Sequence, residues 1–590
     1  MTVTPPDRKR ITAMFQSILR AWARVSPRRR FHIFLLGVLM VLASLVEIAS
    51  LGAVVPFLAV ITAPERLFAH PVVLEIARFL GIHEPQGLLF PITAGFILAA
   101  AGCSFLRMLV LWASTRLAYG AGADISHEIY MRTLYQPYAV HLARNSSEIV
   151  AGITSKTGNA IGILVSILNA VAAIFFLIAI MCTLLYIDAV STCIAFGSLG
   201  LVYAVLMRAS ERKLRENSRC IAEESSRVVQ CLNEGLGGIR DVLIDGCQEV
   251  YCDAYRKADL PRRRAEGINQ IIGQGPRYLL EAFGMGLLAA MAYGMVLRGG
   301  MDRALPVIGS LTMGMQRLMP VLQQLYSSWV TVLGNATVLQ EILDLLEQPL
   351  PKTLGGPDAK PEPMPFRRDV RLCGVGFRYG EEHPWVLRNV DLTIPKGCRM
   401  GFAGETGSGK TTLLDIVMGL LPPTEGSLEV DGVPVTEENR RAWQVHIAHV
   451  PQSIFLSDTT IEENIAFGVP KNRIDSERVQ DAARKACIAD VIERMPKKYK
   501  AKVGERGVRL SGGQRQRIGI ARALYKKADV LVFDEATSAL DNATEASVME
   551  ALDRLDPELT VLIIAHRLST LQNCTHIVRV GGGRLCCEKK

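Results

Sequence analysis

The chain has 590 residues, of which 49% are hydrophobic and 21% charged, and its net charge is +9 at neutral pH. A mean hydropathy of +0.23 argues against an ordinary soluble enzyme, and the apolar content excludes a disordered chain, which would be poor in such residues. Glycine and proline, with 50 and 28 residues, are near average usage, so collagen-like and low-complexity proteins are excluded as well.

The first 30 residues concentrate positive charge, with eight Lys or Arg against the single acid Asp7. Such a segment is typical of a nucleic-acid-binding arm or of the cytoplasmic flank of a membrane span. Residues 31–61 follow as one apolar run interrupted by His32 and Glu47, which favours the membrane flank and no nucleic-acid partner. The run is longer than the roughly 7–15 residues of a signal-peptide core, so we expect a membrane span.

Six apolar runs are long enough to cross the hydrocarbon layer, which takes about 20 helical residues. They cover residues 31–61, 88–114, 160–187, 189–208, 273–298 and 304–334. Because Lys and Arg gather in the connections that would lie inside the cell, we expect both termini in the cytoplasm. The sequence thus predicts four regions: a basic cytoplasmic segment, a transmembrane domain with six helices, a linker and a soluble domain, covering residues 1–30, 31–345, 346–366 and 367–590.

The connections between the predicted spans are long and have helical character. In 115–159 and 209–272, polar sequence carries apolar residues at spacings of three, four and seven, which predicts cytoplasmic extensions of the spans. Residues 62–87 mix apolar and charged side chains in an amphipathic pattern. That pattern favours either a helix lying at the outer membrane surface or a capping helix packed on the bundle.

Charged residues within predicted spans are candidates for cargo contact, because charge at membrane depth is costly and usually faces the bundle interior or a watery cavity. Arg317 is the most prominent, deep in the last span. It could meet an anionic cargo, form a salt bridge with Glu281 or Glu47, or snorkel. The candidate cavity residues are Arg317, Arg107, Glu281, Arg298 and Arg303.

The strongest motif in the soluble half is GETGSGKTT at Gly404–Thr412, which matches GxxxxGK[ST]. It follows the strand-like stretch Cys398–Ala403 and precedes the helical stretch Thr411–Leu420. Glycines let backbone N–H groups curl around phosphate oxygens, and the helix N-terminus adds its positive dipole end. The motif predicts that Lys410 reaches the β- and γ-phosphates of ATP and that Thr411 supplies a hydroxyl to Mg²⁺.

Two adjacent acids, Asp534 and Glu535, follow the apolar stretch Val530–Phe533. Carboxylates at the carboxyl end of a buried parallel strand lie at the usual ligand-binding edge of an α/β sheet. We expect Asp534 to hold Mg²⁺, directly or through water, and Glu535 to polarise the attacking water.

Further motifs resemble the nucleotide-binding domain of ATP-binding cassette transporters over about 367–590. They are LSGGQ at Leu510–Gln514, VPQS with Gln452, SALD at Ser538–Asp541, and His566 after the apolar stretch 560–565. The resemblance implies that Tyr379 stacks on adenine, that Gln452 couples Mg²⁺ and water to the membrane half, and that His566 contacts the γ-phosphate. The implied catalytic residues are Glu535, His566 and Gln452, and the implied metal ligands are Thr411, Gln452 and Asp534. The implied nucleotide-binding residues are Tyr379, Gly404, Glu405, Thr406, Gly407, Ser408, Gly409, Lys410, Thr411, Thr412, Ser511, Gly512, Gly513, Gln514 and Asp541.

The resemblance also implies a dimer, because the signature residues Ser511–Gln514 would complete the ATP site of another subunit and each motif occurs once in the chain. A homodimer with two hydrolytic sites is expected, and a heterodimer remains the alternative. A membrane domain that precedes the nucleotide-binding domain in one chain resembles exporters of this superfamily. Glu505, in VGERG, matches the family's intersubunit coupling segment.

Three stretches, at 136–149, 231–244 and 275–284, resemble the bacterial PglK-type flippases of lipid-linked oligosaccharides. That resemblance implies flipping of a polyprenyl-pyrophosphate glycan across the bacterial inner membrane, among membrane lipids. The alternatives are export of lipid A, drugs or peptides, or a regulatory protein that binds ATP without pumping, against which Glu535 and His566 argue.

Overall fold

A computed structural model describes most of the chain. The described residues are 20, 27–54, scattered positions between 57 and 82, 84–187, 189–299, 301–350, 361–535, 545–548, 550, 558–564, 571 and 574–589. They form two compact units. The helical unit comprises residues 1–136 and 144–349, and the α/β unit comprises residues 137–143 and 350–590.

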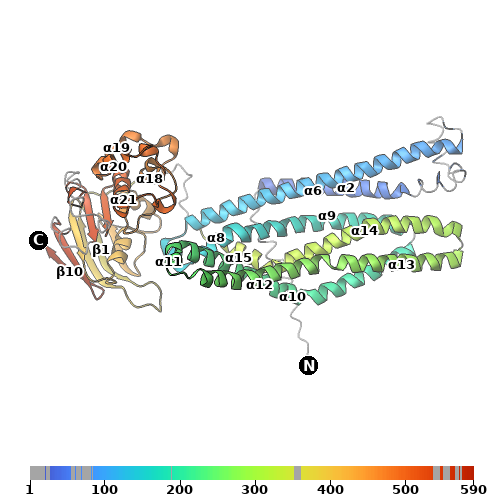
Figure 1. Cartoon of the computed structure of the whole chain (residues 1–590), viewed down its shortest axis with the longest axis horizontal. Coiled ribbons are helices and arrows are strands. Elements are labelled where there is room, and N and C mark those ends of the chain that lie inside the picture. Colours follow the sequence, from blue (N-terminus) through green and yellow to red (C-terminus); the bar gives the residue numbers. More distant parts are fainter. Residues whose placement is uncertain are drawn as a thin grey trace, which may run out of the picture. The chain divides into compact units, whose positions relative to one another are not determined.

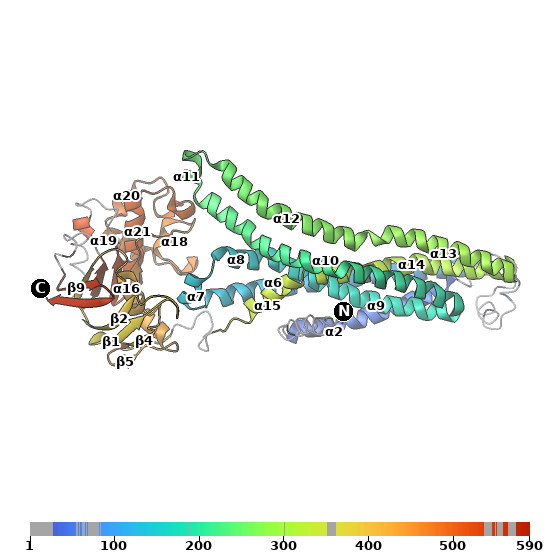
Figure 2. The ribbon, with the colours of Figure 1, turned by 90° about the horizontal axis from the view of Figure 1, so that it is seen from below.

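The helical unit is built from long helices that lie side by side (Figures 1 and 2). Its elements are α2 (Pro27–Gly52), η1 (Pro85–Leu88), α6 (Leu89–Leu134), α8 (Ser146–Ala151), the π-helical turn η2 (Gly152–Lys156), α9 (Thr157–Ile187), α10 (Ala189–Gly237), α11 (Ile239–Ile244), α12 (Gln248–Gln274), α13 (Pro276–Gly299), α14 (Met301–Gly334) and α15 (Ala336–Leu346). The predicted amphipathic segment 62–87 falls mostly outside the described residues.

Four helical stretches of the described residues are long and apolar enough to cross a membrane. They are Pro27–Ser50, Pro85–Leu134, Ser146–Tyr186 and Thr192–Gly237. Helices α13 and α14, with 24 and 34 residues, cover the fifth and sixth predicted runs. Apolar side chains from α2, α6, α9, α10, α13 and α14 share one buried core, so these elements form a single multi-helix bundle.

Small residues let the bundle helices approach closely. A Cβ added to Gly314 of α14 would lie 2.6 Å from Leu184 of α9, and one added to Gly334 would lie 2.7 Å from the side chain of Asn269. Close approach of this kind is typical of helix packing in membranes, where small residues rather than exclusion of water bring backbones together.

Polar side chains join the helices where the sequence predicts their extensions beyond the membrane. Asn217 donates to Asn269 Oδ1 over 2.7 Å, which ties α10 to α12, and Ser218 donates to Thr337 Oγ1 over 3.0 Å. Helices α10 and α12 form a hairpin with the short helix α11 at its tip (Figure 2). The segments 115–159 and 209–272 therefore form helices over most of their length, broken at residues 135–137, at residues 144–145 and around α11.

The α/β unit contains two sheets. An antiparallel sheet has the order β2-β1-β4-β5, with strands Asp369–Phe377 (β1), Leu387–Pro395 (β2), Glu425–Val430 (β4) and Val433–Pro434 (β5). The larger sheet has the order β10-β9-β3-β8-β7-β6 and is parallel except for β10, with strands Arg399–Ala403 (β3), Ile447–Val450 (β6), Val530–Asp534 (β7), Thr560–Ile564 (β8), His576–Gly581 (β9) and Arg584–Lys589 (β10).

Strands β3, β7 and β8 have almost entirely buried residues, as expected for parallel strands covered on both faces. The longer helices of this unit are α16 (Lys410–Val417), α19 (Ser476–Lys485) and α21 (Gly512–Lys526), and the shorter ones are α7 (Tyr138–Ala143), α17 (Arg440–Gln444), α18 (Ile461–Ile465) and α20 (Ala489–Glu493). Helices α18–α21 gather on one side of the larger sheet (Figure 1). The predicted fold class, a membrane helical bundle fused to an α/β phosphate-loop domain, is confirmed.

Candidate functional site

The phosphate-binding loop connects β3 to α16, and its glycines adopt backbone conformations that other residues avoid. Gly407 has φ of 81° and Gly409, which precedes the first helical residue, has φ of 99°. Side chains with a Cβ are disfavoured in that left-handed region. The loop can therefore fold tightly at the N-terminus of α16, where free N–H groups and the helix dipole favour a phosphate.

Lys410 is buried beneath this loop, with 6% of its surface exposed. Its Nζ donates to the carbonyl oxygens of Gly404 and Glu405 over 2.8 and 2.7 Å, so the lysine holds the loop in its curved form. The buried hydroxyl of Ser408 has no hydrogen-bond partner among the described residues. An unsatisfied buried hydroxyl is unusual, and here it provides a donor that fits a phosphate oxygen.

Carboxylates lie next to this cradle. The Thr411 hydroxyl hydrogen-bonds the Asp534 carboxylate, at the end of β7. Burial, together with the charge of Glu535, raises the pKa of Asp534, while the Thr411 hydrogen bond and Lys410 act in the opposite direction. Burial, together with the charge of Asp534, raises the pKa of Asp415 to about 6. The cluster thus concentrates negative charge that a cation would relieve.

A hydroxyl and a carboxylate are the oxygen ligands that Mg²⁺ prefers, so Thr411 and Asp534 fit that ion. No group of three or more His, Cys, Asp or Glu side chains within the described ranges is arranged to hold a metal alone. A magnesium ion at this place would therefore depend on phosphate oxygens for part of its shell, which is its usual mode of binding in nucleotide enzymes.

Glu535 is held in a strained and fixed position. Its φ of 50° is uncommon for a residue with a side chain, and its backbone N–H donates to the carbonyl of Ile564 over 3.1 Å. Gln452 Nε2 donates to Glu535 Oε2 over 2.8 Å. Strain of this kind concentrates at functional sites, and here it orients one carboxylate beside the end of β7.

Tyr379 lies close to the other end of the loop. Its hydroxyl hydrogen-bonds Thr412 Oγ1 over 3.0 Å, and its ring packs edge-on against Phe377. About half of its surface, 52%, is exposed. An aromatic face that is tethered and still open is suited to stacking on a planar base.

The signature segment forms the N-terminus of α21. Ser511 and Gln514 form a capping box, in which each side chain accepts a hydrogen bond from the other residue's backbone N–H. No hydrogen bond joins the described residues of Ser511–Gln514 to Gly404–Thr412 of the same chain. Asp541 and His566 lie outside the described residues.

Three of the charged residues in the predicted spans form one cluster around a buried glutamate in the helical unit. Glu47 of α2 has no exposed surface. Its carboxylate lies 2.8 Å from Arg107 Nη2 of α6 and 2.6 Å from Arg317 Nη1 of α14. Of the alternatives for Arg317, the structure therefore contains the salt bridge to Glu47, whereas Glu281 pairs over 2.7 Å with Arg277 on its own helix.

The side chains of Arg298 and Arg303 lie outside the described residues. Sequence reasoning missed Cys103 and Ser50, which complete the Glu47 cluster, and Asp415, which lies behind Asp534. Asp415 has a local signal, since it is an acid five residues after Lys410 with apolar residues directly on both sides. Cys103 and Ser50 have no local signal. The partner of Cys103, Glu47, is 56 residues away, and the contact of Ser50 with Arg317 depends on how the helices are rotated.

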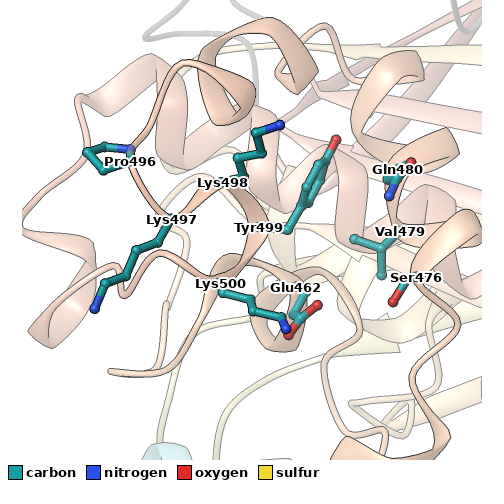
Figure 3. A pocket seen from close by; sticks show the side chains of 9 residues that line it. All are labelled: Glu462, Ser476, Val479, Gln480, Pro496, Lys497, Lys498, Tyr499 and Lys500. Atoms are coloured by element: carbon teal, nitrogen blue, oxygen red, sulfur yellow. The ribbon is translucent and has the colours of Figure 1, made fainter.

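A second hollow of the α/β unit, about 370 Å³ in volume, shares no residue with this site. Lys497, Lys498 and Lys500 surround it together with Tyr499, which points toward Val479 and Gln480 of α19 (Figure 3). Glu462 also lines the hollow, and the negative charge of its carboxylate would repel an anion. The hollow offers no chemistry comparable to that of the phosphate loop.

A phosphate loop with a paired glutamate, joined in one chain to apolar helices long enough to cross a bilayer, defines a membrane-bound P-loop ATPase. A family model described as ABC transporter matches residues 387–538. An ATP-dependent lipid A-core flippase from Bordetella avium is 31% identical over 503 residues, 83% of this chain and 82% of that protein. One from Chromohalobacter salexigens is 34% identical over 467 residues, 78% of each chain.

A solved structure of a bacterial Atm1-family ABC exporter with ATP bound has the same fold, with a TM-score of 0.74, 23% identity and 94% of both chains covered. The chain belongs to the ABC transporter family. It is an exporter-type half-transporter, a multi-pass membrane protein whose ATPase activity is coupled to translocation. These relatives are named as flippases of lipid A-core. They favour lipid A, one of the alternatives, over the lipid-linked oligosaccharide that the sequence resemblance implied.

Proposed function

We propose that this protein is a homodimeric flippase that uses ATP to move a phosphorylated, amphipathic glycolipid of the lipid A class across the bacterial inner membrane, with both termini in the cytoplasm. The observation that carries the choice of cargo is 30–34% identity to lipid A-core flippases over about four fifths of the chain. A polyprenyl-pyrophosphate glycan is the second candidate. It shares an anionic headgroup and an apolar tail with the first.

Hydrolysis follows from the geometry of the nucleotide site. The loop N–H groups and Lys410 hold the β- and γ-phosphates, and Tyr379 stacks on the adenine. Glu535, oriented by Gln452, accepts a proton from the water that attacks the γ-phosphorus, and the bond to the β-phosphate oxygen breaks. Thr411 and Asp534 would hold Mg²⁺, which would supply positive charge against the phosphates. Preorganised donors of this kind stabilise the charge that develops on the transferring phosphoryl group.

The signature segment supports a dimer. Ser511–Gln514 makes no hydrogen bond to the described phosphate loop of its own chain, and its helix N-terminus is a suitable site for a phosphate of a nucleotide bound to a second copy. Two copies would thus complete two ATP sites between them, and Glu535 in each makes both sites hydrolytic.

The tip of the α10–α12 hairpin offers a surface through which closure of the ATP sites could act on the spans. Leu236, Ile239, Leu243 and Ile244 are 68%, 46%, 60% and 70% exposed. Clustered apolar side chains on a polar hairpin mark an interaction site. We assign this tip, near Ile244, and the α7 region near 137–147 to the transmission of closure to the membrane helices.

The cluster of Glu47, Arg107 and Arg317 supports an anionic cargo. Two arginines share one glutamate, which leaves an excess of one positive charge at a place where charge is costly. A phosphate accepts several charge-assisted hydrogen bonds from guanidinium groups. We assign Arg107 and Arg317 to the headgroup path, with Arg298 and Arg303 as further candidates and Glu281 as a weaker one.

The test uses the full chain in proteoliposomes. Addition of lipid A is expected to stimulate ATP hydrolysis several-fold. With ATP present, lipid A should then appear in the opposite leaflet. Glu535→Gln should reduce hydrolysis by about 100-fold or more, because it removes the general base. A zwitterionic phospholipid is the matched cargo control and should not stimulate.

Two outcomes would contradict the proposal in different ways. If only a polyprenyl-pyrophosphate glycan stimulated and was flipped, the cargo assignment would be wrong while ATP-driven flipping stood. If wild type and Glu535→Gln hydrolysed ATP equally, the assigned ATPase mechanism would be wrong as a whole.

A further inference from the structure

The buried cluster in the helical unit joins three helices through a single carboxylate. Glu47 on α2 receives Arg317 Nη1 at Oε1 over 2.6 Å, and Arg107 Nη2 and the Cys103 thiol at Oε2 over 2.8 and 2.7 Å. Arg317 also donates to Ser50 Oγ over 3.1 Å. Both oxygens of Glu47 are engaged, and the carboxylate has no exposed surface.

The two arginines are less enclosed than the acid that pairs with them. The Arg107 and Arg317 side chains are 37% and 23% exposed, against 0% for Glu47. Arg107 Nε and Nη2 are buried and have no hydrogen-bond partner within the described structure, although Nη2 lies within ion-pair distance of Glu47, and the guanidinium lies 5.0 Å from the ring centre of Phe176. A guanidinium presents five donors, and Glu47 occupies only part of them, so each arginine has further donors for a second anion.

We propose that Glu47 is an internal counter-ion that an anionic cargo headgroup displaces. Without cargo, Glu47 neutralises one of the two guanidinium charges and keeps the arginines in place. An arriving phosphate, with more charge and more acceptor oxygens than a carboxylate, takes over the two arginines. This inference rests on the proposed function, because it concerns how that same cargo is recognised and released.

Displacement of Glu47 has a structural consequence. The contacts of Glu47 and Ser50 tie α2 to both α6 and α14, which are 60 and 270 residues away along the chain. When phosphate replaces the carboxylate, these ties are exchanged for ties to cargo. A headgroup would thus loosen α2 within the bundle, and return of Glu47 to the arginines would promote release. A neutral or zwitterionic headgroup lacks the net charge to compete.

The experiment compares variants of the full chain in nanodiscs of zwitterionic lipid, with lipid A and chemically dephosphorylated lipid A as probes. Glu47→Gln removes the competing charge and preserves the shape of the side chain. It should bind lipid A about tenfold more tightly and release it more slowly, so that flipping slows although affinity rises. Dephosphorylated lipid A should not show the gain.

Asp124→Asn is the matched control. Asp124 of α6 pairs with Arg29 of α2 over 3.0 Å, so this change also removes an ion pair between α2 and α6, but an exposed one outside the cluster. It should leave the affinity for lipid A within about twofold of wild type. The same gain in both variants would overturn the counter-ion role and assign the effect to looser packing of α2.

A further variant keeps the test decisive if Glu47→Gln folds poorly, because that change leaves two arginines without their acid. The double change Glu47→Gln with Arg317→Gln restores the wild-type excess of one positive charge, and its affinity should fall below that of wild type since one phosphate-binding arginine is lost. The inference would be overturned if Glu47→Gln bound lipid A with the affinity of wild type. Should that variant not fold, the same result for the double variant would overturn it. Failure of wild type itself to bind lipid A would instead contradict the proposed function.

Discussion

Trp443 has no exposed surface and is the largest of the fully buried side chains among the residues that the structure describes. Its indole Nε1 donates to the carbonyl of Val417, at the end of α16, over 2.8 Å, and its ring packs edge-on against Phe366. The residue thus anchors the C-terminal end of the helix whose N-terminus carries the phosphate loop. A polar tip with a partner is what allows so large an amphipathic ring to be fully buried.

Replacing Trp443 by Phe should destabilise the α/β unit by about 2–3 kcal/mol, because the Val417 carbonyl loses its donor and a small cavity remains. Thermal unfolding of the purified transporter should show a fall of about 2–4 °C per kcal/mol for a unit of this size. Trp385→Phe is the control, since Trp385 is partly exposed and its ring stacks with Arg378 near the surface. Equal shifts in both variants would contradict the anchoring role.

At this scale, residues that are adjacent in the sequence were predictable and residues that meet across the fold were not. Lys410 and Thr411 belong to a contiguous loop whose spacing already defines its geometry. The partner of Arg317 was left open between Glu281 and Glu47, because hydropathy does not contain the rotation of one helix against another. The burial of Glu47 settles that choice, with Glu281 paired to Arg277 instead.

Among the elements, α18 shows how one short helix is stabilised by its first residues. Glu463 Oε2 accepts hydrogen bonds from the backbone N–H and the hydroxyl of Thr460 over 2.9 and 2.8 Å, and Lys471 lies 3.1 Å from its other oxygen. The hydrogen bonds from the Thr460 backbone and hydroxyl, followed by that of Lys471, lower the pKa of Glu463 to about 2. The charged carboxylate is therefore the form that stabilises the fold.

This capping box predicts a pH dependence with a defined sign. Because the pKa of Glu463 is lower in the fold than its ordinary value of 4.5, its contribution is complete above about pH 4.5 and is lost as the pH falls toward 2. Glu463→Gln should cost about 1 kcal/mol at pH 7, and the difference in unfolding temperature from wild type should shrink at pH 4. Glu462→Gln, one residue away and outside the box, should show no such narrowing.

The local sequence predicted that a helix exists more accurately than it predicted where the helix begins and ends. The first apolar run was predicted over 31–61, whereas α2 runs from Pro27 to Gly52 and includes the basic residues before the run. Helix α10 continues from an apolar half into a polar half without a break, because backbone hydrogen bonds and packing maintain it where hydropathy changes. Hydropathy marks where a helix enters lipid rather than where it stops.

For the whole molecule, the separation of signature segment and phosphate loop within one chain predicts complementation. A Lys410→Ala chain and a Ser511→Arg chain should each be inactive as homodimers. Mixed dimers contain one intact site, formed by the loop of one chain and the signature of the other, and should recover a measurable fraction of wild-type hydrolysis. A chain that carries both substitutions, mixed with the Lys410→Ala chain, is the control and should recover nothing.

That result would be contradicted if mixed dimers stayed as inactive as their parents while co-purification through two different tags showed that they had formed. The fold class at this scale was predictable, because a phosphate loop and long apolar runs are both local signals. The cargo was not, since the three stretches that resembled oligosaccharide flippases mark a subfamily, whereas the flippases similar over most of the chain carry another lipid in their name.

The uninterrupted length of α10 has a mechanical consequence. Its 49 residues, at 1.5 Å each, make a rod of about 74 Å, more than twice the thickness of the hydrocarbon layer of about 30 Å. A tilt of about 5° around one end would carry the other end through about 6 Å, slightly more than the rise of about 5.4 Å in one helical turn. Under the proposed function, we expect the hairpin to act as a lever, so that a small rotation at its tip moves the far end of α10 sideways by several ångström.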